Sequence, residues 1–140
     1  MERDAIVWPM LALVALTLGV LLLIPFHRLR SGFRGEVWFD DFKLGESERV
    51  PDRVRLPNRN YMNLLELPLL FYVFCLASYV RGQVDEAAVT MAWIYVGLRV
   101  LHSAVHLSIN HVPLRLIAFA ASNVVLTLMW LRFALALAAS

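Results

Sequence analysis

Charged residues and cysteines are scarce in this chain of 140 residues. Only 17% of the residues are charged and Cys75 is the single cysteine, whereas 60% are hydrophobic and the mean hydropathy is +0.65. A soluble domain has about 25% charged and about 45–50% apolar residues, so the composition argues against a water-soluble domain. One cysteine excludes an internal disulfide and a multi-cysteine metal site within a chain. The composition therefore indicates a membrane protein.

Four long apolar runs divide the chain, and each is long enough to cross a membrane as a helix. About 20 residues at ~1.5 Å each span ~30 Å of hydrocarbon, and helices satisfy their backbone hydrogen bonds internally. The sequence predicts an all-α integral membrane fold, a four-transmembrane-helix bundle in one domain over residues 1–140. The expected helices cover about residues 5–26, 58–80, 87–109 and 114–139. Pro68 removes a backbone donor within the second helix and is expected to kink it.

Basic residues gather in one connection between the expected helices. Eight of the thirteen lysines and arginines lie between the first two helices or at the start of the second. The positive-inside rule then predicts that this loop and the loop between the last two helices are cytoplasmic, with both termini on the opposite side. Because the basic residues sit in a loop between apolar helices, the formal charge of +2 does not indicate a nucleic-acid partner.

Two of the expected helices carry polar residues on one face. In the second helix, Arg59, Asn63 and Glu66 are spaced i, i+4, i+7 and lie within about 60° of one another. The third helix carries a polar stripe formed by Arg99, His102, Ser103, His106 and Asn110. An ionisable residue in a membrane helix is costly and usually faces a partner or a wet cavity. We therefore expect Glu66 to pair with a basic residue in a site between these helices.

Structural roles remain open for the same residues. Glu66 and Arg99 can form a buried structural ion pair, and His102 and His106 can be core imidazoles bonded to backbone carbonyls. Arg115 lies near a helix end, where an arginine can snorkel to the interface or set the topology.

Two site chemistries fit the stripe. The first is a metal site, since His102 and His106 are spaced i, i+4 and Glu66 could be a third ligand, although Arg99 beside them repels a cation. The second is an anion site, because arginine forks bind carboxylates bidentately. The arginines available to it are Arg59, Arg99 and Arg115, with Arg28, Arg30, Arg53 and Arg55 from the loop. This set suits a ligand with several carboxylates at a membrane interface.

The spacing of these residues also matches a known pattern. Arg59-x-x-x-Asn63-x-x-Glu66 is followed by Arg99-x-x-His102-x-x-x-His106, and Arg115 comes nine residues later. This pattern resembles the MAPEG family, the membrane-associated proteins of eicosanoid and glutathione metabolism. It is closest to the microsomal glutathione transferase and prostaglandin E synthase branches. The resemblance implies a homotrimer that binds glutathione between helices of adjacent subunits, near the cytoplasmic side.

The resemblance assigns roles to individual residues. It implies that Arg59, Asn63 and Glu66 contact glutathione, that His102 and His106 line the site, and that Arg115 stabilises the thiolate. Arg99 and Arg55 complete the expected glutathione-binding set. His106 stands where tyrosine is usual in these branches, so glutathione chemistry in general is implied rather than one eicosanoid activity.

The implied function is a glutathione-dependent transferase or peroxidase with glutathione as cosubstrate and a lipophilic substrate from the lipid bilayer. Lowering a thiol pKa by two units requires about 2.7 kcal/mol. One arginine at about 4 Å and an effective dielectric of ~20 supplies about 4 kcal/mol before desolvation, so no protein nucleophile is needed. Two alternatives are a non-catalytic trimeric membrane protein, with its glutathione cleft retained or lost, and a metal-dependent membrane enzyme using His102, His106 and Glu66.

Overall fold

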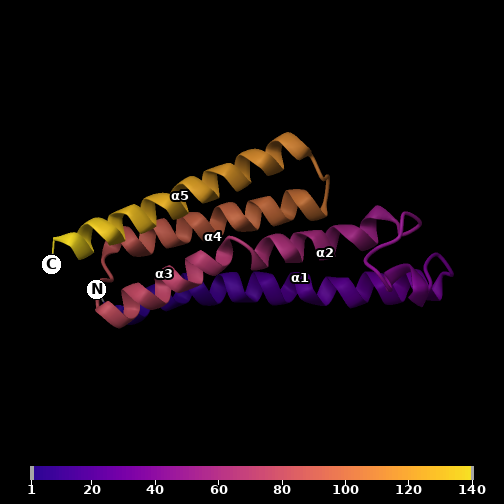
Figure 1. The fold of residues 1–140 in the computed structure, drawn as a ribbon, viewed down its shortest axis with the longest axis horizontal. Helices are drawn as coiled ribbons and strands as arrows, with labels where there is room; N and C mark the ends of the chain where they lie inside the picture. Colours follow the sequence, from indigo (N-terminus) through magenta and orange to yellow (C-terminus); the bar gives the residue numbers. More distant parts are fainter. Residues whose placement is uncertain (1, 140) are drawn as a thin grey trace.

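The structure is a computed structural model that describes residues 2–139, and all the secondary-structure elements in this range are helices. Its α-helices are α1 (Val7–Phe33), α2 (Asp52–Leu65), α3 (Pro68–Arg81), α4 (Glu86–Leu107) and α5 (Val112–Ala138), with the short 3-10 helices η1 (Arg3–Ile6) and η2 (Phe39–Phe42). Helices α2 and α3 follow one another along one rod, so the chain runs back and forth as four rods (Figure 1). All four rods are long and apolar enough to cross a membrane, which confirms the predicted four-helix membrane fold.

The predicted limits of the first two helices are wrong at the loop between them. We expected the first helix to end near residue 26 and the second to begin near residue 58, but α1 continues to Phe33 and α2 begins at Asp52. The apolar run marks the thickness of the hydrocarbon and not the end of the helix. A helix of 27 residues is about 40 Å long at ~1.5 Å per residue, so its last turns lie beyond a ~30 Å core, where polar side chains cost little.

The predicted kink at Pro68 is a complete break between two helices. Glu66 leaves the helical conformation with ψ −99°, and Pro68 opens α3 as its first residue. Proline has no N–H to donate to the carbonyl four residues earlier, so the hydrogen-bond ladder cannot continue across it. The break lies midway along the rod, at membrane depth, where freed backbone carbonyls need new partners.

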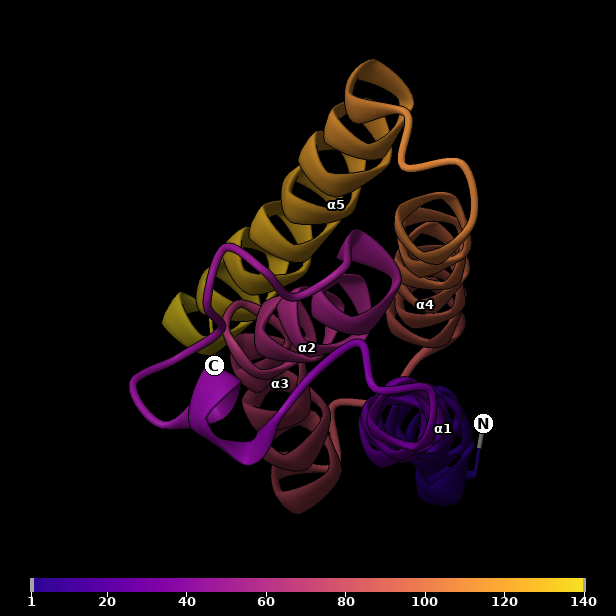
Figure 2. The same cartoon turned by 90° about the vertical axis from the view of Figure 1, so that its right-hand side faces the viewer.

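Helix α4 is the most extensively packed helix of the bundle. It packs most closely against α5 and also contacts α1 and α2, while α3 contacts α1 and α5. Seen from the end, α5 leans across the bundle and diverges from α2 toward the turn that joins it to α4 (Figure 2). The apolar core includes Leu13, Leu64, Phe71, Tyr95 and Met129. Helix α2 and the C-terminal end of α4 lie toward the same end of the molecule as the 34–51 loop (Figure 1).

The 34–51 loop folds over the end of α1 and α2 as an ordered cap. The buried carboxylate of Asp41 accepts hydrogen bonds from the Trp38 backbone N–H at 2.8 Å and from the Ser47 hydroxyl at 2.7 Å. These two bonds hold the pKa of Asp41 below its ordinary value. Arg28 contacts Glu46, and Arg53 contacts Glu36. The loop is thus tied to both helices that it connects.

Candidate functional site

The polar stripe of α4 is buried inside the single chain. Arg99 is 0% exposed, His102 3%, Ser103 1% and His106 2%. Burying charged and imidazole groups among membrane helices is costly unless they are hydrogen-bonded. Two neighbouring helices, α2 and α5, supply hydrogen-bond partners for Arg99, His102 and Ser103.

Arg99 takes up a carbonyl freed by the α2–α3 break. Its Nη2 donates to the backbone oxygen of Asn63 at 2.6 Å. In an uninterrupted helix this oxygen would accept from the N–H of Leu67, four residues on. Arg99 Nε and Nη1 have no hydrogen-bond partner among residues 2–139. A fully buried guanidinium with two unpartnered donor nitrogens can donate hydrogen bonds to an anion or another strong acceptor.

The turn between α4 and α5 holds Arg115 against the same cluster. Its Nη1 donates to the Asn110 side-chain oxygen at 2.7 Å, and its backbone oxygen lies 3.0 Å from His102 Nδ1. Asn110 has φ +45°, a left-handed conformation that asparagine tolerates better than most side chains. The geometry of this turn therefore sets where the Arg115 guanidinium lies.

A small cavity opens where the three helices meet. Its volume is about 210 Å³, and it is lined by Asn63, His102, Val112, Arg115, Leu116 and Phe119. His106 lies beside it, with its ring centroid 5.7 Å from that of His102. Both His106 ring nitrogens and His102 Nε2 lack a partner among the described residues. The cavity is thus lined by an arginine, an amide and one buried imidazole together with three apolar side chains, and a second buried imidazole lies beside it.

Arg59 and Glu66 lie at the edge of this cluster and are exposed in the single chain. Arg59 acts electrostatically on His106, and Glu66 acts electrostatically on Arg99. The expected ion pair of Glu66 with a basic residue is not formed among residues 2–139, which corrects our prediction. Glu66 is the C-cap residue of α2, and its carboxylate acts on Arg99 from beyond ion-pair distance.

Arg55 is placed differently from the other candidates. Its guanidinium donates to the backbone oxygen of Ser47, so it is engaged in holding the 34–51 loop. The metal alternative gains no support, because no group of three histidine, cysteine or acidic side chains within residues 2–139 could hold a metal ion. His102 and His106 are near one another as predicted from their i, i+4 spacing, but Glu66 does not join them.

The structure adds two residues to the site that we did not predict from the sequence. Asn60 is fully buried and accepts a hydrogen bond from the Ser103 hydroxyl at 3.2 Å. The Phe119 ring lies 5.6 Å from the Arg99 guanidinium carbon, and its centroid is 5.7 Å from that of His102. Asn60 precedes Asn63 by three residues, a helical spacing that could have revealed it. Nothing in the pattern distinguishes Phe119 from the other apolar residues of α5.

A comparison with sequence models of protein families identifies the family of this chain. The sequence model of the MAPEG family matches residues 6–135, which is nearly the whole chain. The chain belongs to the MAPEG family. No curated protein and no solved structure matches the sequence. As a MAPEG protein it is an integral, multi-pass membrane protein of a family associated with glutathione and eicosanoid metabolism.

Proposed function

We propose that this MAPEG protein is a glutathione-dependent membrane transferase or peroxidase whose site is the α2–α4–α5 cluster. The observation that carries the proposal is a cavity lined by His102 and Arg115, with His106 beside His102 and the Arg99 guanidinium beside the lining ring of Phe119. Two nitrogens of Arg99 have no hydrogen-bond partner among residues 2–139. Glutathione carries two carboxylates and a thiol, so it needs cationic donors for binding and a positive charge beside the sulfur. Both are available here without a protein nucleophile.

Each side chain has a role in the proposed chemistry. Arg59 and Arg99 would bind carboxylates, and Glu66 would accept the ammonium group. Arg115, held by Asn110, would stabilise the negative charge of the thiolate. Transfer then forms a carbon–sulfur bond to the electrophile as its leaving group departs with the bonding electrons. With a hydroperoxide, sulfur instead takes one peroxide oxygen, and a second glutathione completes the reduction to an alcohol, water and glutathione disulfide.

The site also supports the proposal of a homotrimer with sites between subunits. The cavity of about 210 Å³ is smaller than the ~300 Å³ lower limit of ordinary ligand pockets. Arg59 and Glu66, which the proposal needs, lie on the uncovered face of α2. A second copy laid against that face would enlarge the pocket and shield these charges from lipid. The expected location of the site, on the cytoplasmic side, follows from the basic loop at the same end.

The proposal is tested with purified protein, glutathione, and either an aryl halide or an organic hydroperoxide. We expect saturable turnover that depends on glutathione, and the same turnover in Arg81→Ala, which removes an exposed arginine at the opposite end of the molecule. Glutathione binding without turnover of either substrate would favour the non-catalytic alternative. If the protein shows no glutathione binding and no turnover, the proposal is overturned.

A further inference from the structure

The last two turns of α1 and the loop after it form an exposed surface that the glutathione site does not use. Phe33 is 90% exposed, Phe39 96% and Trp38 64%, and Leu29 and Phe26 are exposed beside them. We call these five residues the aromatic platform. Large apolar patches on an exposed face mark a surface that is covered in use.

Two grooves flank a ridge in the aromatic platform made by Leu29 and Phe33. One groove, about 490 Å³, lies between this ridge and the loop aromatics Trp38, Phe39 and Phe42. The other, also about 490 Å³, lies on the opposite side of the ridge and is lined by Phe26, Leu29, Arg30, Phe33 and Arg34. Two grooves that share one apolar ridge can accommodate the two hydrocarbon chains of a diacyl lipid.

The position of the platform along α1 places it at the level of lipid headgroups. Trp8 lies at the start of α1, where an exposed tryptophan suits the opposite interface. About 20 residues cover a ~30 Å hydrocarbon core, so counting from Trp8 the core ends near Arg28. The platform therefore lies at the boundary between the acyl chains and the phosphates, with Phe26 and Leu29 close to the end of the hydrocarbon core.

The charges around the platform select the lipid. Arg30 and Arg34 are one helical turn apart, beside the second groove, and within residues 2–139 neither forms an ion pair. Glu36 interacts electrostatically with Arg34, but its ion pair is with Arg53. Arg28 is already occupied, since it contacts Glu46 at 3.4 Å and lies 4.4 Å from the centre of the Phe42 ring. Guanidinium forks bind phosphate oxygens bidentately. Two unpaired arginines beside two apolar grooves fit a phosphodiester carrying two acyl chains and a net negative charge.

We infer that the aromatic platform is a binding site for an anionic phospholipid, with its phosphate on Arg30 and Arg34 and the glycerol ends of its two acyl chains in the two grooves. This site is separate from the α2–α4–α5 cluster. Each arginine near an anionic lipid contributes roughly fivefold in affinity. The two together should therefore enrich anionic lipid at the platform by about fivefold to about 25-fold over its bulk fraction.

The test uses Trp38 as a reporter within the platform. The full chain is reconstituted in phosphatidylcholine with a few mole per cent of brominated phosphatidylglycerol, whose bromines quench tryptophan on contact. The Trp38 signal is the difference between the wild-type chain and Trp38→Phe, because Trp8, Trp93 and Trp130 are common to both. We expect several-fold stronger quenching of Trp38 by brominated phosphatidylglycerol than by brominated phosphatidylcholine at the same mole fraction.

Two double variants identify the cause of that preference. Arg30→Gln with Arg34→Gln should reduce the quenching by brominated phosphatidylglycerol to the phosphatidylcholine level. Arg3→Gln with Arg81→Gln, which removes the same charge at the opposite end of the molecule, should leave it unchanged. Equal quenching of the wild-type chain by the two lipids, or quenching by neither because another protein copy covers the platform, would overturn the inference. Native mass spectrometry gives an independent readout, in which the wild-type chain should retain phosphatidylglycerol that the first variant loses.

Discussion

Arg115 is held at the cavity by the residues of its own turn. Asn110 accepts from its guanidinium at 2.7 Å, and the Asn110 backbone N–H itself bonds to the Val105 oxygen at 2.8 Å. The side chain is half-buried and lines the cavity, so its charge acts in a medium less screened than water. At the scale of single residues, this pair offers the sharpest tests of the proposed function.

Arg115→Ala should greatly reduce thiolate formation while the protein stays assembled. Without the guanidinium, the pKa of bound thiol returns toward ~8.5, where thiolate is a few per cent of the total at neutral pH. The measurement is ultraviolet absorbance of the thiolate, or turnover, across a pH series. Arg59→Ala is the matched variant, and it should weaken glutathione binding instead because its target is a carboxylate. If Arg115→Ala forms thiolate as the wild-type chain does, then Arg99 or a loop arginine stabilises the thiolate instead.

Asn110→Gly should distinguish the effect of the turn conformation from the effect of the hydrogen bond to Arg115. Glycine keeps the left-handed backbone available but removes the acceptor of the 2.7 Å hydrogen bond. We expect thiolate formation to fall about three- to tenfold, because the hydrogen bond contributes about 1 kcal/mol to holding the guanidinium. Glutathione affinity and thermal stability should change little. Unchanged thiolate formation would mean that the Asn110 side chain does not position Arg115.

At the scale of elements, the α2–α3 break connects the fold to the site. The break frees the Asn63 carbonyl, and the buried Arg99 donates to it. This exchange gives the charged side chain a partner and gives the interrupted backbone a donor. A local defect in one helix therefore fixes a guanidinium on another helix.

Pro68→Ala should close the break and displace Arg99. Alanine restores an N–H, so the helix can continue through residues 66–68 and Leu67 can donate to Asn63. We expect slower hydrogen exchange over residues 64–70 and weaker glutathione binding. Pro57→Ala, a buried proline near the start of α2, is the control and should affect neither measurement in this region. Slower exchange with unchanged glutathione affinity would show that the break does not serve the site.

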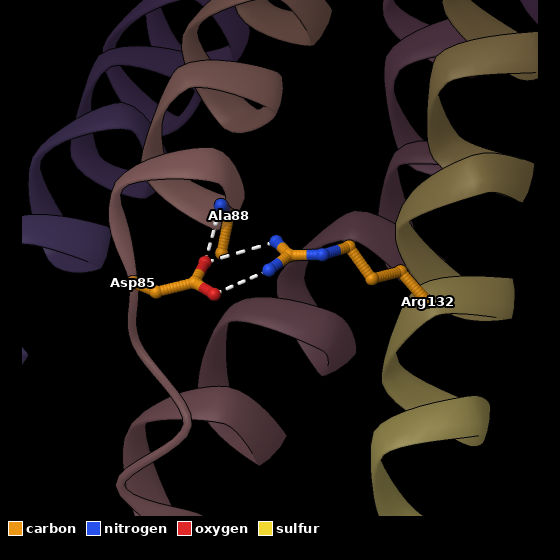
Figure 3. A network of polar contacts seen from close by, with 3 residues as sticks. All are labelled: Asp85, Ala88 and Arg132. Carbon is orange, nitrogen blue, oxygen red and sulfur yellow. Dashed lines mark hydrogen bonds and ion pairs between the residues drawn. The ribbon is translucent and has the colours of Figure 1, made fainter.

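The end of the molecule opposite the 34–51 loop is held by one acidic residue with two functions. Asp85 accepts from the Ala88 backbone N–H at 2.9 Å as the N-cap of α4, and it binds Arg132 of α5 through both of its oxygens (Figure 3). These contacts with Arg132 and Ala88 hold the pKa of Asp85 below its ordinary value. The pair therefore joins the two helices at the end where they lie closest to the termini (Figure 1).

Two substitutions of Asp85 should differ in a defined way. Asp85→Asn keeps a good N-cap and loses only the ion pair, which for exposed groups is worth about 0.2–1 kcal/mol. Asp85→Ala loses both and should cost about 1 kcal/mol more. The measurement is the free energy of unfolding in detergent. Equal losses in the two variants would show that the side chain does not act as a cap.

The contribution of Asp85 should also depend on pH in one direction. Because its folded-state pKa is lowered, the carboxylate stabilises the fold above the unfolded carboxyl pKa of ~3.9, and this stability is lost as the pH falls through the folded value. The stability difference between the wild-type chain and Asp85→Asn should be constant from about pH 8 to about pH 5 and shrink below about pH 4. A difference that grows on acidification would contradict this assignment.

At the scale of the whole molecule, the single chain leaves charged side chains on a face at membrane depth. Arg59 and Glu66 are exposed on α2, and the cavity beside them is small for a tripeptide. Ionisable residues within a membrane are expected to face protein or water rather than lipid. We therefore predict a complex of three chains of 15.9 kDa each when mass is measured in mild detergent. A stable monomer that still binds glutathione would contradict both the trimer and the intersubunit site.

Much of the fold follows from local sequence features. Four apolar runs specify four spans, because backbone groups in lipid can be satisfied only within a helix or a closed barrel. Pro68 specifies the break in the second rod, since a missing N–H acts locally. The i, i+4 spacing of His102 and His106 places them on one helical face. These inferences need no knowledge of neighbouring helices.

Which residues of the site contact one another depends on the tertiary structure. Glu66 and Arg99 are on facing helices, but Glu66 is exposed and forms no ion pair within residues 2–139. The Asn63 carbonyl takes the place beside Arg99 that we had expected for a carboxylate. Asn60 and Phe119 join the site because α4 packs against both α2 and α5. Periodicity determines which residues share a face of one helix, but the tilt and depth at which helices pack decide which faces meet. That is why the motif could be read from the sequence while its contacts could not.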